Sequence, residues 1–165
     1  MGMIGNYVAV KGDTLEKIKS GELDFFDIDP EKCPTLDIDK SWQAIHYMLC
    51  KGEIAEGDPP MGYVVPMHSD NLLDVEMDFG AFMITCEQVQ EAYEAIKNIY
   101  EAQFRAKYDI KSLAEDEVYP VVDADTDDET FFEYLFDYFN QIRDFYKQAI
   151  ENSQEIIFYI RVYIQ

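Results

Sequence analysis

The residue types most able to carry chemistry gather in one short segment, residues 36–46. The segment holds the only tryptophan of the chain, one of its two histidines, two carboxylates and a lysine. In a helix that begins at Asp39, Trp42 and His46 share one face, with Asp39 one turn before Trp42. A carboxylate beside His46 favours its imidazolium, which suits acid–base catalysis near neutral pH. The candidate catalytic residues are therefore His46, Asp37 and Asp39, and the candidate ligand-binding residues are Lys40, Trp42 and His46.

A structural role explains the same residues without catalysis. Asp39 would cap the helix, Trp42 would fill the core, and His46 would hydrogen-bond a backbone carbonyl. Lys40 would stand in the first turn, where the helix dipole disfavours a cation, so a carboxylate such as Asp37 is expected to hold it. We favour this interpretation because buried polar side chains usually find partners within the core.

The second histidine lies in the run Met67-His68-Ser69-Asp70, which invites comparison with a hydrolytic triad. Triad members are usually brought together from distant segments, and the sequence has no G-x-S-x-G elbow to present a serine. An exposed turn is the better interpretation of His68.

No pattern in the sequence points to a metal or a cofactor. The acidic run 123–128 imitates a calcium loop, but Asp128 and Tyr134 stand where an EF-hand needs glycine and glutamate. Acidic residues in the first turn of a helix complement its dipole, which explains the run better. The histidines and cysteines lack the spacing of zinc ligands, and no glycine-rich phosphate loop is present. We therefore predict no metal site and no cofactor.

The charge of the chain is strongly negative, at −21 from 34 acidic and 13 basic residues. Neither stretch 52–96 nor stretch 112–142 contains a lysine or an arginine. Such a field repels phosphate backbones and anionic lipids, so we expect no nucleic-acid binding and no membrane docking. It would steer a basic protein partner towards the chain. An acidic mimic of nucleic acid is a further, weaker alternative.

Three cysteines without close pairing argue against a disulfide framework and suit a reducing compartment. The N-terminus lacks the features of a secretory signal, and no apolar run approaches the roughly 20 residues of a membrane helix. We expect a cytoplasmic protein.

A chain of 165 residues fits a single domain, here residues 1–165. The apolar patterns predict strands at 3–10, 63–65 and 155–164, and the first and last of these are expected to pair. Capping signals predict helices that open at Asp13, Asp39, Thr85 and Thr126, the second ending at Cys50 and the third near Lys107. The expected fold is α/β, a three-layer domain with a small mixed sheet and helices on both faces.

Several blocks of the sequence resemble the YfbM-like family of uncharacterised bacterial proteins. The resemblance is carried by Met1-Gly2-Met3-Ile4-Gly5, by Leu36-Asp37-Ile38-Asp39-Lys40-Ser41-Trp42 with Ile45-His46, and by Val118-Tyr119-Pro120. It extends over the whole chain, although the run from Met67 to Met77 carries more acids and less glycine than is typical of the family. The resemblance implies a three-layer α/β fold and implies no reaction, because the family is a domain of unknown function.

Two functions of different classes follow from these observations. We predict a protein of unknown function that acts as a non-enzymatic, acidic binding protein, for example an immunity-like protein that recognises a basic partner. The alternative is a small-molecule enzyme or ligand sensor with a pocket around Asp37, Asp39, Trp42 and His46. Convergence of their polar atoms on one pocket would favour the alternative.

Overall fold

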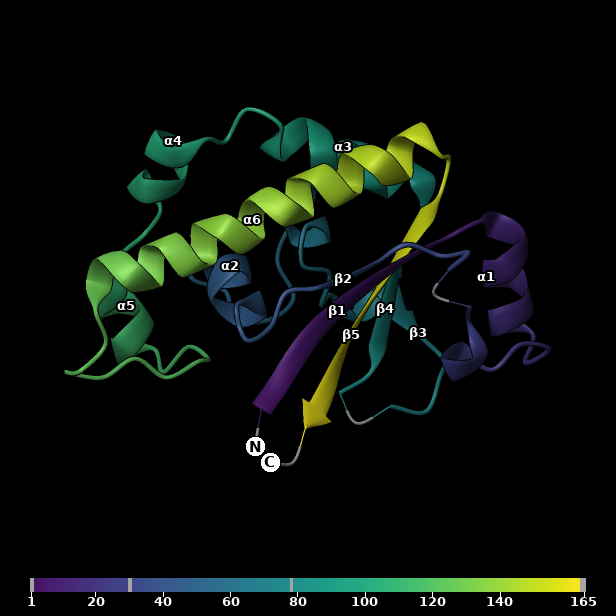
Figure 1. The fold of residues 1–165 in the computed structure, drawn as a ribbon, viewed down its shortest axis with the longest axis horizontal. Helices are drawn as coiled ribbons and strands as arrows, with labels where there is room; N and C mark the ends of the chain where they lie inside the picture. The colour runs from purple at the N-terminus through teal and green to yellow at the C-terminus, as the bar shows by residue number, and fades with distance from the viewer. Residues whose placement is uncertain (1, 30, 78, 164–165) are drawn as a thin grey trace.

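A five-stranded sheet forms the centre of the fold (Figure 1). The computed structural model describes residues 2–29, 31–77 and 79–163. The strand order is β2–β1–β5–β4–β3, and each pairing between these strands is antiparallel. The strands are β1 Gly2–Val10, β2 Thr35–Asp37, β3 Leu72–Leu73, β4 Ala81–Ile84 and β5 Glu155–Tyr163. The α/β class is confirmed, whereas the sheet is antiparallel rather than mixed.

The first and last strands pair along their whole length, from Gly2 opposite Tyr163 to Val10 opposite Glu155. The expected pairing is therefore confirmed. Alternate residues of β5 enter different clusters of buried side chains, Phe158 one cluster and Ile157 the other. Apolar side chains on both faces are the signature of a strand covered on both sides. Ile164, which the sequence places in this strand, lies outside the described residues.

Helices cover both faces of the sheet, which is compatible with the three-layer organisation that the sequence suggests. Side chains of α2, α3 and α6 bury one face, whereas α1 and the 3₁₀ helix Phe25–Asp27 pack against the other. In Figure 1, α6 crosses in front of α2 and α3, and α1 stands apart from them. The helices are α1 Gly12–Lys19, α2 Trp42–Leu49, α3 Cys86–Ile96, α4 Glu101–Ala106, α5 Ile110–Glu115 and α6 Asp128–Glu151.

Local capping signals locate some helix starts and miss others. The capping box of Thr85 is confirmed, because its hydroxyl accepts from the Gln88 N–H and the Gln88 side chain accepts from the Thr85 N–H. At α6 the cap is Asp127 rather than Thr126, and α1 starts at Gly12 without using Asp13 as a cap. At α2 the predicted start at Asp39 is wrong, since the helix begins at Trp42.

The helix predicted from Thr85 to Lys107 is broken into α3 and α4. At the break, Tyr100 has extended backbone angles, with φ −101° and ψ −168°. The Ile99 carbonyl next to it accepts a hydrogen bond from the Arg143 guanidinium of α6. A contact with a distant helix thus satisfies a carbonyl that a continuous helix would have used internally.

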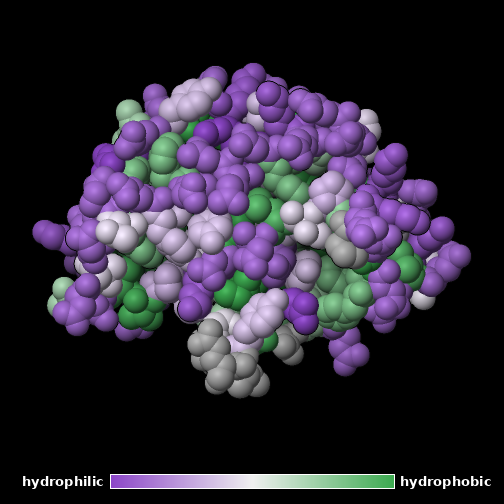
Figure 2. Space-filling model, in the orientation of Figure 1, coloured by the Kyte–Doolittle hydropathy of each residue, from purple (hydrophilic) through white to green (hydrophobic). Residues whose placement is uncertain are grey.

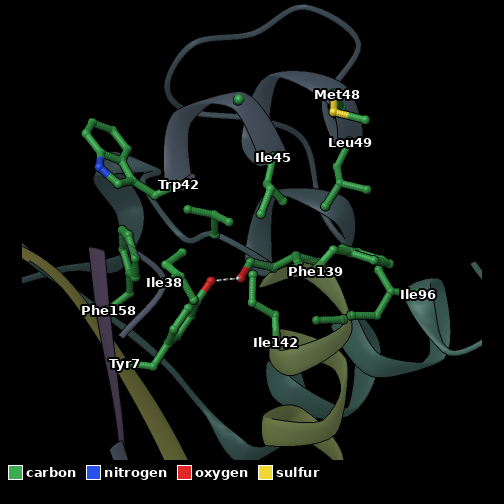
Figure 3. Close-up of a cluster of buried hydrophobic side chains, with 14 of the residues drawn as sticks. Tyr7, Ile38, Trp42, Ile45, Met48, Leu49, Ile96, Phe139, Ile142 and Phe158 are labelled. Carbon is green, nitrogen blue, oxygen red and sulfur yellow. Dashed lines mark hydrogen bonds between the residues drawn. The ribbon is translucent and has the colours of Figure 1, made fainter. Parts of the chain in front are cut away.

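The predicted strand 63–65 is not formed. Tyr63 is the last residue of the 3₁₀ helix Met61–Tyr63, and Val64 and Val65 continue as a buried, irregular turn. Its carbonyls are satisfied by side chains rather than by a neighbouring strand. The Val64 carbonyl accepts from Tyr7 Oη at 2.6 Å and from Tyr146 Oη at 2.8 Å. Figure 3 shows Tyr7 reaching from β1 into the cluster that contains Ile38, Ile142 and Phe158. The two valines therefore suggested a strand, whereas the segment is a buried turn whose carbonyls are hydrogen-bonded by side chains.

Gly5 marks the closest approach between β1 and the segment that leads into α2. A Cβ atom added at Gly5 would lie 3.0 Å from Trp42 Cβ, 3.1 Å from a Phe158 ring carbon and 3.2 Å from Ile38 Cγ1. All three neighbours are buried, so none of them can move away into solvent.

We predict that Gly5→Ala lowers the free energy of unfolding by about 1–3 kcal/mol, because overpacking strains a well-filled core. Gly12→Ala is the matched control, since the nearest atom to its added Cβ is 3.8 Å away. Urea denaturation of both variants measures the effect. Equal stabilities of the two variants would contradict the close packing at Gly5.

Candidate functional site

Asp39 forms a left-handed turn before α2, with φ of 51°. The Asp37 carboxylate accepts from the Asp39 N–H at 2.7 Å, and the Asp39 carboxylate accepts from Tyr134 Oη of α6 at 2.6 Å. Tyr134 Oη also accepts from the Lys40 N–H at 3.0 Å. Burial, and then the Asp39 carboxylate, raise the pKa of Tyr134. Asp37 and Asp39 therefore fix the turn and attach it to α6.

Trp42 and Lys40 point towards the N-terminal end of β1. The Trp42 indole N–H donates to the Met3 carbonyl at 2.8 Å, and its ring lies 5.7 Å from that of Tyr119. Figure 3 shows the indole turned away from Ile45, which enters the core. The Lys40 side chain lies beside Gly2, and among the described residues neither Asp37 nor any other carboxylate forms an ion pair with it.

His46 points to a third region, the buried segment 63–65. It is fully buried, and its Nδ1 lies 3.0 Å from the Val65 carbonyl, so Nδ1 carries the proton and donates. Its Nε2 has no hydrogen-bond partner within the described residues. Gly57 covers this edge of the ring, since a Cβ there would lie 3.2 Å from Nε2. Burial lowers the pKa of His46, although the Val65 and Ala55 carbonyls oppose the shift.

The segment 36–46 thus sends its polar groups in three directions, to α6, to β1 and to the segment 63–65. Asp37, Asp39, Lys40, Trp42 and His46 line none of five cavities formed by the described residues. The arrangement holds three parts of the fold together and offers no common point at which a substrate would meet His46 and a carboxylate.

His68, interpreted from the sequence as an exposed turn, lines a cavity of about 490 Å³. Its Nδ1 accepts from the Asp70 N–H at 3.0 Å, so its Nε2 carries the proton and donates to the Glu56 carboxylate at 3.2 Å. The Ser69 hydroxyl likewise faces Glu56, at 3.4 Å, so these neighbours do not form a serine–histidine pair.

Cys50 lines the same cavity but is unsuited to nucleophilic attack. Burial, followed by the charges of Glu53 and Asp58, raises the pKa of the Cys50 thiol to about 11. The thiolate, rather than the thiol, is the reactive species, so Cys50 is inert at neutral pH. No sequence pattern marks this cavity, because residues 50–61 converge on His68 only through the folding of an irregular loop.

A second acidic depression lies between α4 and α6, and we call it the α4–α6 groove. It has a volume of about 610 Å³. It is lined by Glu101, Thr130, Phe132, Glu133, Tyr134, Phe136, Asp137 and Asn140. Three carboxylates and three aromatic rings therefore line the groove, and no lysine or arginine does. Figure 2 shows that hydrophilic residues cover most of the face that carries α6, with apolar residues between them.

One end of the groove holds a guanidinium of the protein itself. The Arg105 guanidinium carbon lies 3.9 Å from the centre of the Phe132 ring. Both of its terminal nitrogens donate to the Glu129 carboxylate at 2.9 Å, and one also donates to Glu101 at 3.2 Å. These contacts raise the pKa of Arg105 and lower that of Glu129. The surface is thus chemically suited to an arginine side chain.

The described residues form neither a metal-binding cluster nor a membrane-spanning helix. Across residues 2–29, 31–77 and 79–163, no group of three or more His, Cys, Asp and Glu side chains is placed to hold a metal ion. None of the helices in the same ranges is both long enough and apolar enough to cross a membrane.

The chain belongs to the family described as Domain of unknown function (DUF1877), whose family model matches residues 1–159. It is also similar to the crystal structure of YfbM from Escherichia coli, a protein of unknown function. That similarity has a TM-score of 0.73 and 17% sequence identity, and it covers 96% of this chain and 99% of that chain. At this identity the likeness shows the fold alone. No curated protein matches the chain. The resemblance to the YfbM-like family is confirmed.

The buried position of His46 predicts a pH-dependent stability. Its folded pKa lies below the ordinary value of 6.5, so below that pH the unfolded chain binds a proton that the folded protein resists. The free energy of unfolding should therefore fall as the pH falls from 6.5 towards the lowered pKa. Urea denaturation between about pH 7.5 and about pH 5, an interval around the ordinary histidine pKa, measures the slope.

His46→Gln should reduce this slope, because glutamine does not titrate and can still donate to the Val65 carbonyl. His68→Gln is the matched control, since it removes the other histidine of the chain. An unchanged slope in His46→Gln would assign the pH dependence to other groups.

The turn at Asp39 depends on one tyrosine hydroxyl. Tyr134→Phe should cost about 1–2 kcal/mol of stability, because the Asp39 carboxylate and the Lys40 N–H both lose a partner. Tyr138→Phe, one turn further along α6 and also half-buried, is the control. Thermal or urea unfolding compares the two, and similar losses would show that the hydroxyl of Tyr134 has no special role.

Proposed function

We propose that this protein is a non-enzymatic binding protein that recognises a basic segment of a protein partner at the α4–α6 groove. The observation that carries the proposal is the lining of the groove, which brings three carboxylates and three aromatic rings together. Arg105 engages Glu101 and Phe132 at one end. The other two carboxylates, Glu133 and Asp137, form no ion pair among the described residues. Carboxylates attract lysine and arginine side chains, and aromatic faces add cation–π attraction.

The charge of the whole chain supports the same proposal. A net charge of −21 creates a long-range field that accelerates encounter with a basic partner and repels acidic ones. An immunity-like protein that neutralises a basic toxin is one concrete form of such a function. We place this activity in the bacterial cytoplasm, where the three free thiols of Cys33, Cys50 and Cys86 would remain reduced.

The exposure of the groove limits the affinity of any single contact. The Glu101 and Glu129 side chains that hold Arg105 are 65% and 58% exposed. Exposed ion pairs of this kind contribute roughly 0.2–1 kcal/mol each, and salt weakens them further. Binding must therefore engage several basic side chains at once, and it should be strongly dependent on ionic strength.

A fluorescently labelled peptide of alternating glycine and basic residues, lysine and arginine in equal number, tests the proposal. Fluorescence anisotropy should detect binding at low salt and its loss in high salt. The double variant Glu133→Gln/Asp137→Asn should weaken binding about fivefold, which corresponds to the loss of two exposed charge contacts.

Glu16→Gln/Glu22→Gln is the matched control, because it changes the net charge equally at exposed positions in and after α1. It should change the affinity much less than the groove variant. Equal effects of the two double variants would mean that net charge alone attracts the peptide, and the groove would then not be the site.

A further inference from the structure

The residue spacing of the Arg105 site recurs one helical turn further along α6. Glu133 follows Glu129 by four residues, and Phe136 follows Phe132 by four residues. Residues four apart lie on the same helix face, displaced by about 6 Å along the axis. The pair that holds Arg105, Glu129 with Phe132, is therefore repeated by Glu133 with Phe136 on the same surface.

The orientation of the rings extends this repetition. Phe132 and Phe136 are stacked, with ring centres 5.8 Å apart and an angle of 16° between their planes. Both rings line the groove, but Phe132 is 1% exposed beneath Arg105, whereas Phe136 is half-buried. A guanidinium at the second position would therefore face a ring whose plane is nearly parallel to that of Phe132.

The described residues supply no cation to this second position. Glu133 takes part in none of the ion pairs found among them, and Phe136 in none of the cation–π contacts. Arg143, at the far end of the groove, is held by the Ile99 carbonyl, the Asn140 side chain and the Tyr100 ring. Asp137 adds a second carboxylate to the lining that Glu133 and Phe136 share.

Arginine fits this arrangement better than lysine does. A guanidinium is planar, so it can lie flat on a ring while two of its N–H groups donate to one carboxylate, as Arg105 does with Glu129. A lysine ammonium is a compact, strongly hydrated charge and cannot make both contacts in this geometry.

We propose that the partner inserts an arginine side chain at Glu133 and Phe136, where it reproduces the Arg105 site one turn further along α6. This inference rests on the proposed function and specifies the residue type that the groove recognises. The occupant is an arginine-bearing segment of a basic protein.

Three labelled peptides of identical length and spacing test the inference, carrying arginine, lysine or asymmetric dimethylarginine at the basic positions. Fluorescence anisotropy at low salt should show the arginine peptide binding about three to ten times more tightly than the lysine peptide. Dimethylarginine keeps the charge but blocks paired hydrogen bonding, so its affinity should fall towards that of lysine.

Two variants locate the preference. Phe136→Leu should bring the arginine and lysine peptides to similar affinities by removing the ring. Glu133→Gln, at an exposed position that leaves the core untouched, should do the same by removing the carboxylate. Glu16→Gln is the charge-matched control for Glu133→Gln and should preserve the preference.

The outcomes separate this inference from the proposed function. Equal binding of the arginine and lysine peptides, still weakened by Glu133→Gln/Asp137→Asn, would overturn the arginine inference and leave the proposed function standing. An arginine preference that survives both Phe136→Leu and Glu133→Gln would overturn the assigned position. Absence of binding by all three peptides would overturn the inference and the proposed function together.

Discussion

The fold depends on satisfying the backbone of a segment that crosses the core without regular structure. Residues 63–65 run from the last residue of a 3₁₀ helix into a buried turn and pair with none of the described strands, so their carbonyls need other donors. Tyr7, His46 and Tyr146 supply them, from β1, α2 and α6 respectively. An unpaired buried carbonyl is costly, so these three side chains fix the position of their elements as well as that of the segment.

This requirement also changes how the segment 36–46 is understood. Its polar residues are the kinds that catalysis uses, yet three of them are hydrogen-bonded to distant parts of the fold. Asp39 is tied to Tyr134, Trp42 to Met3 and His46 to Val65. The same junction closes on Gly5, where β1 comes too near for a side chain. Concentration of rare residues in a short sequence can therefore mark a packing junction as readily as an active site.

Local patterns predicted the parts of the fold whose causes are local. The alternation of β5 and the Thr85 capping box could be recognised because strand faces and capping partners lie a few residues apart. The turn at Asp39 could not, because its carboxylate is engaged by Tyr134 from a distant helix. The break after Ile96 could not be predicted either, because the Ile99 carbonyl is satisfied by Arg143 from a helix that is distant in sequence.

The sequence allows the charge of the groove to be predicted, but not its shape. Glu129, Glu133 and Asp137 recur every four residues in a stretch without lysine or arginine, so an acidic face of α6 could have been inferred. The position of α4 beside that face could not, since it follows from the broken helix. Sequence reasoning therefore reached the charge of the surface but not the groove, and its candidate site was the segment 36–46 instead.

The pairing of β1 with β5 has a consequence for how the chain reaches this structure. Contacts between residues at such distant positions have a high contact order, and loop-closure entropy must be overcome before they form. During synthesis β1 is made first, and its principal neighbour is made only after α6. Until β5 is made, β1 exposes apolar side chains and unpaired backbone groups to other strands. Pairing of β1 with β5 therefore competes with aggregation.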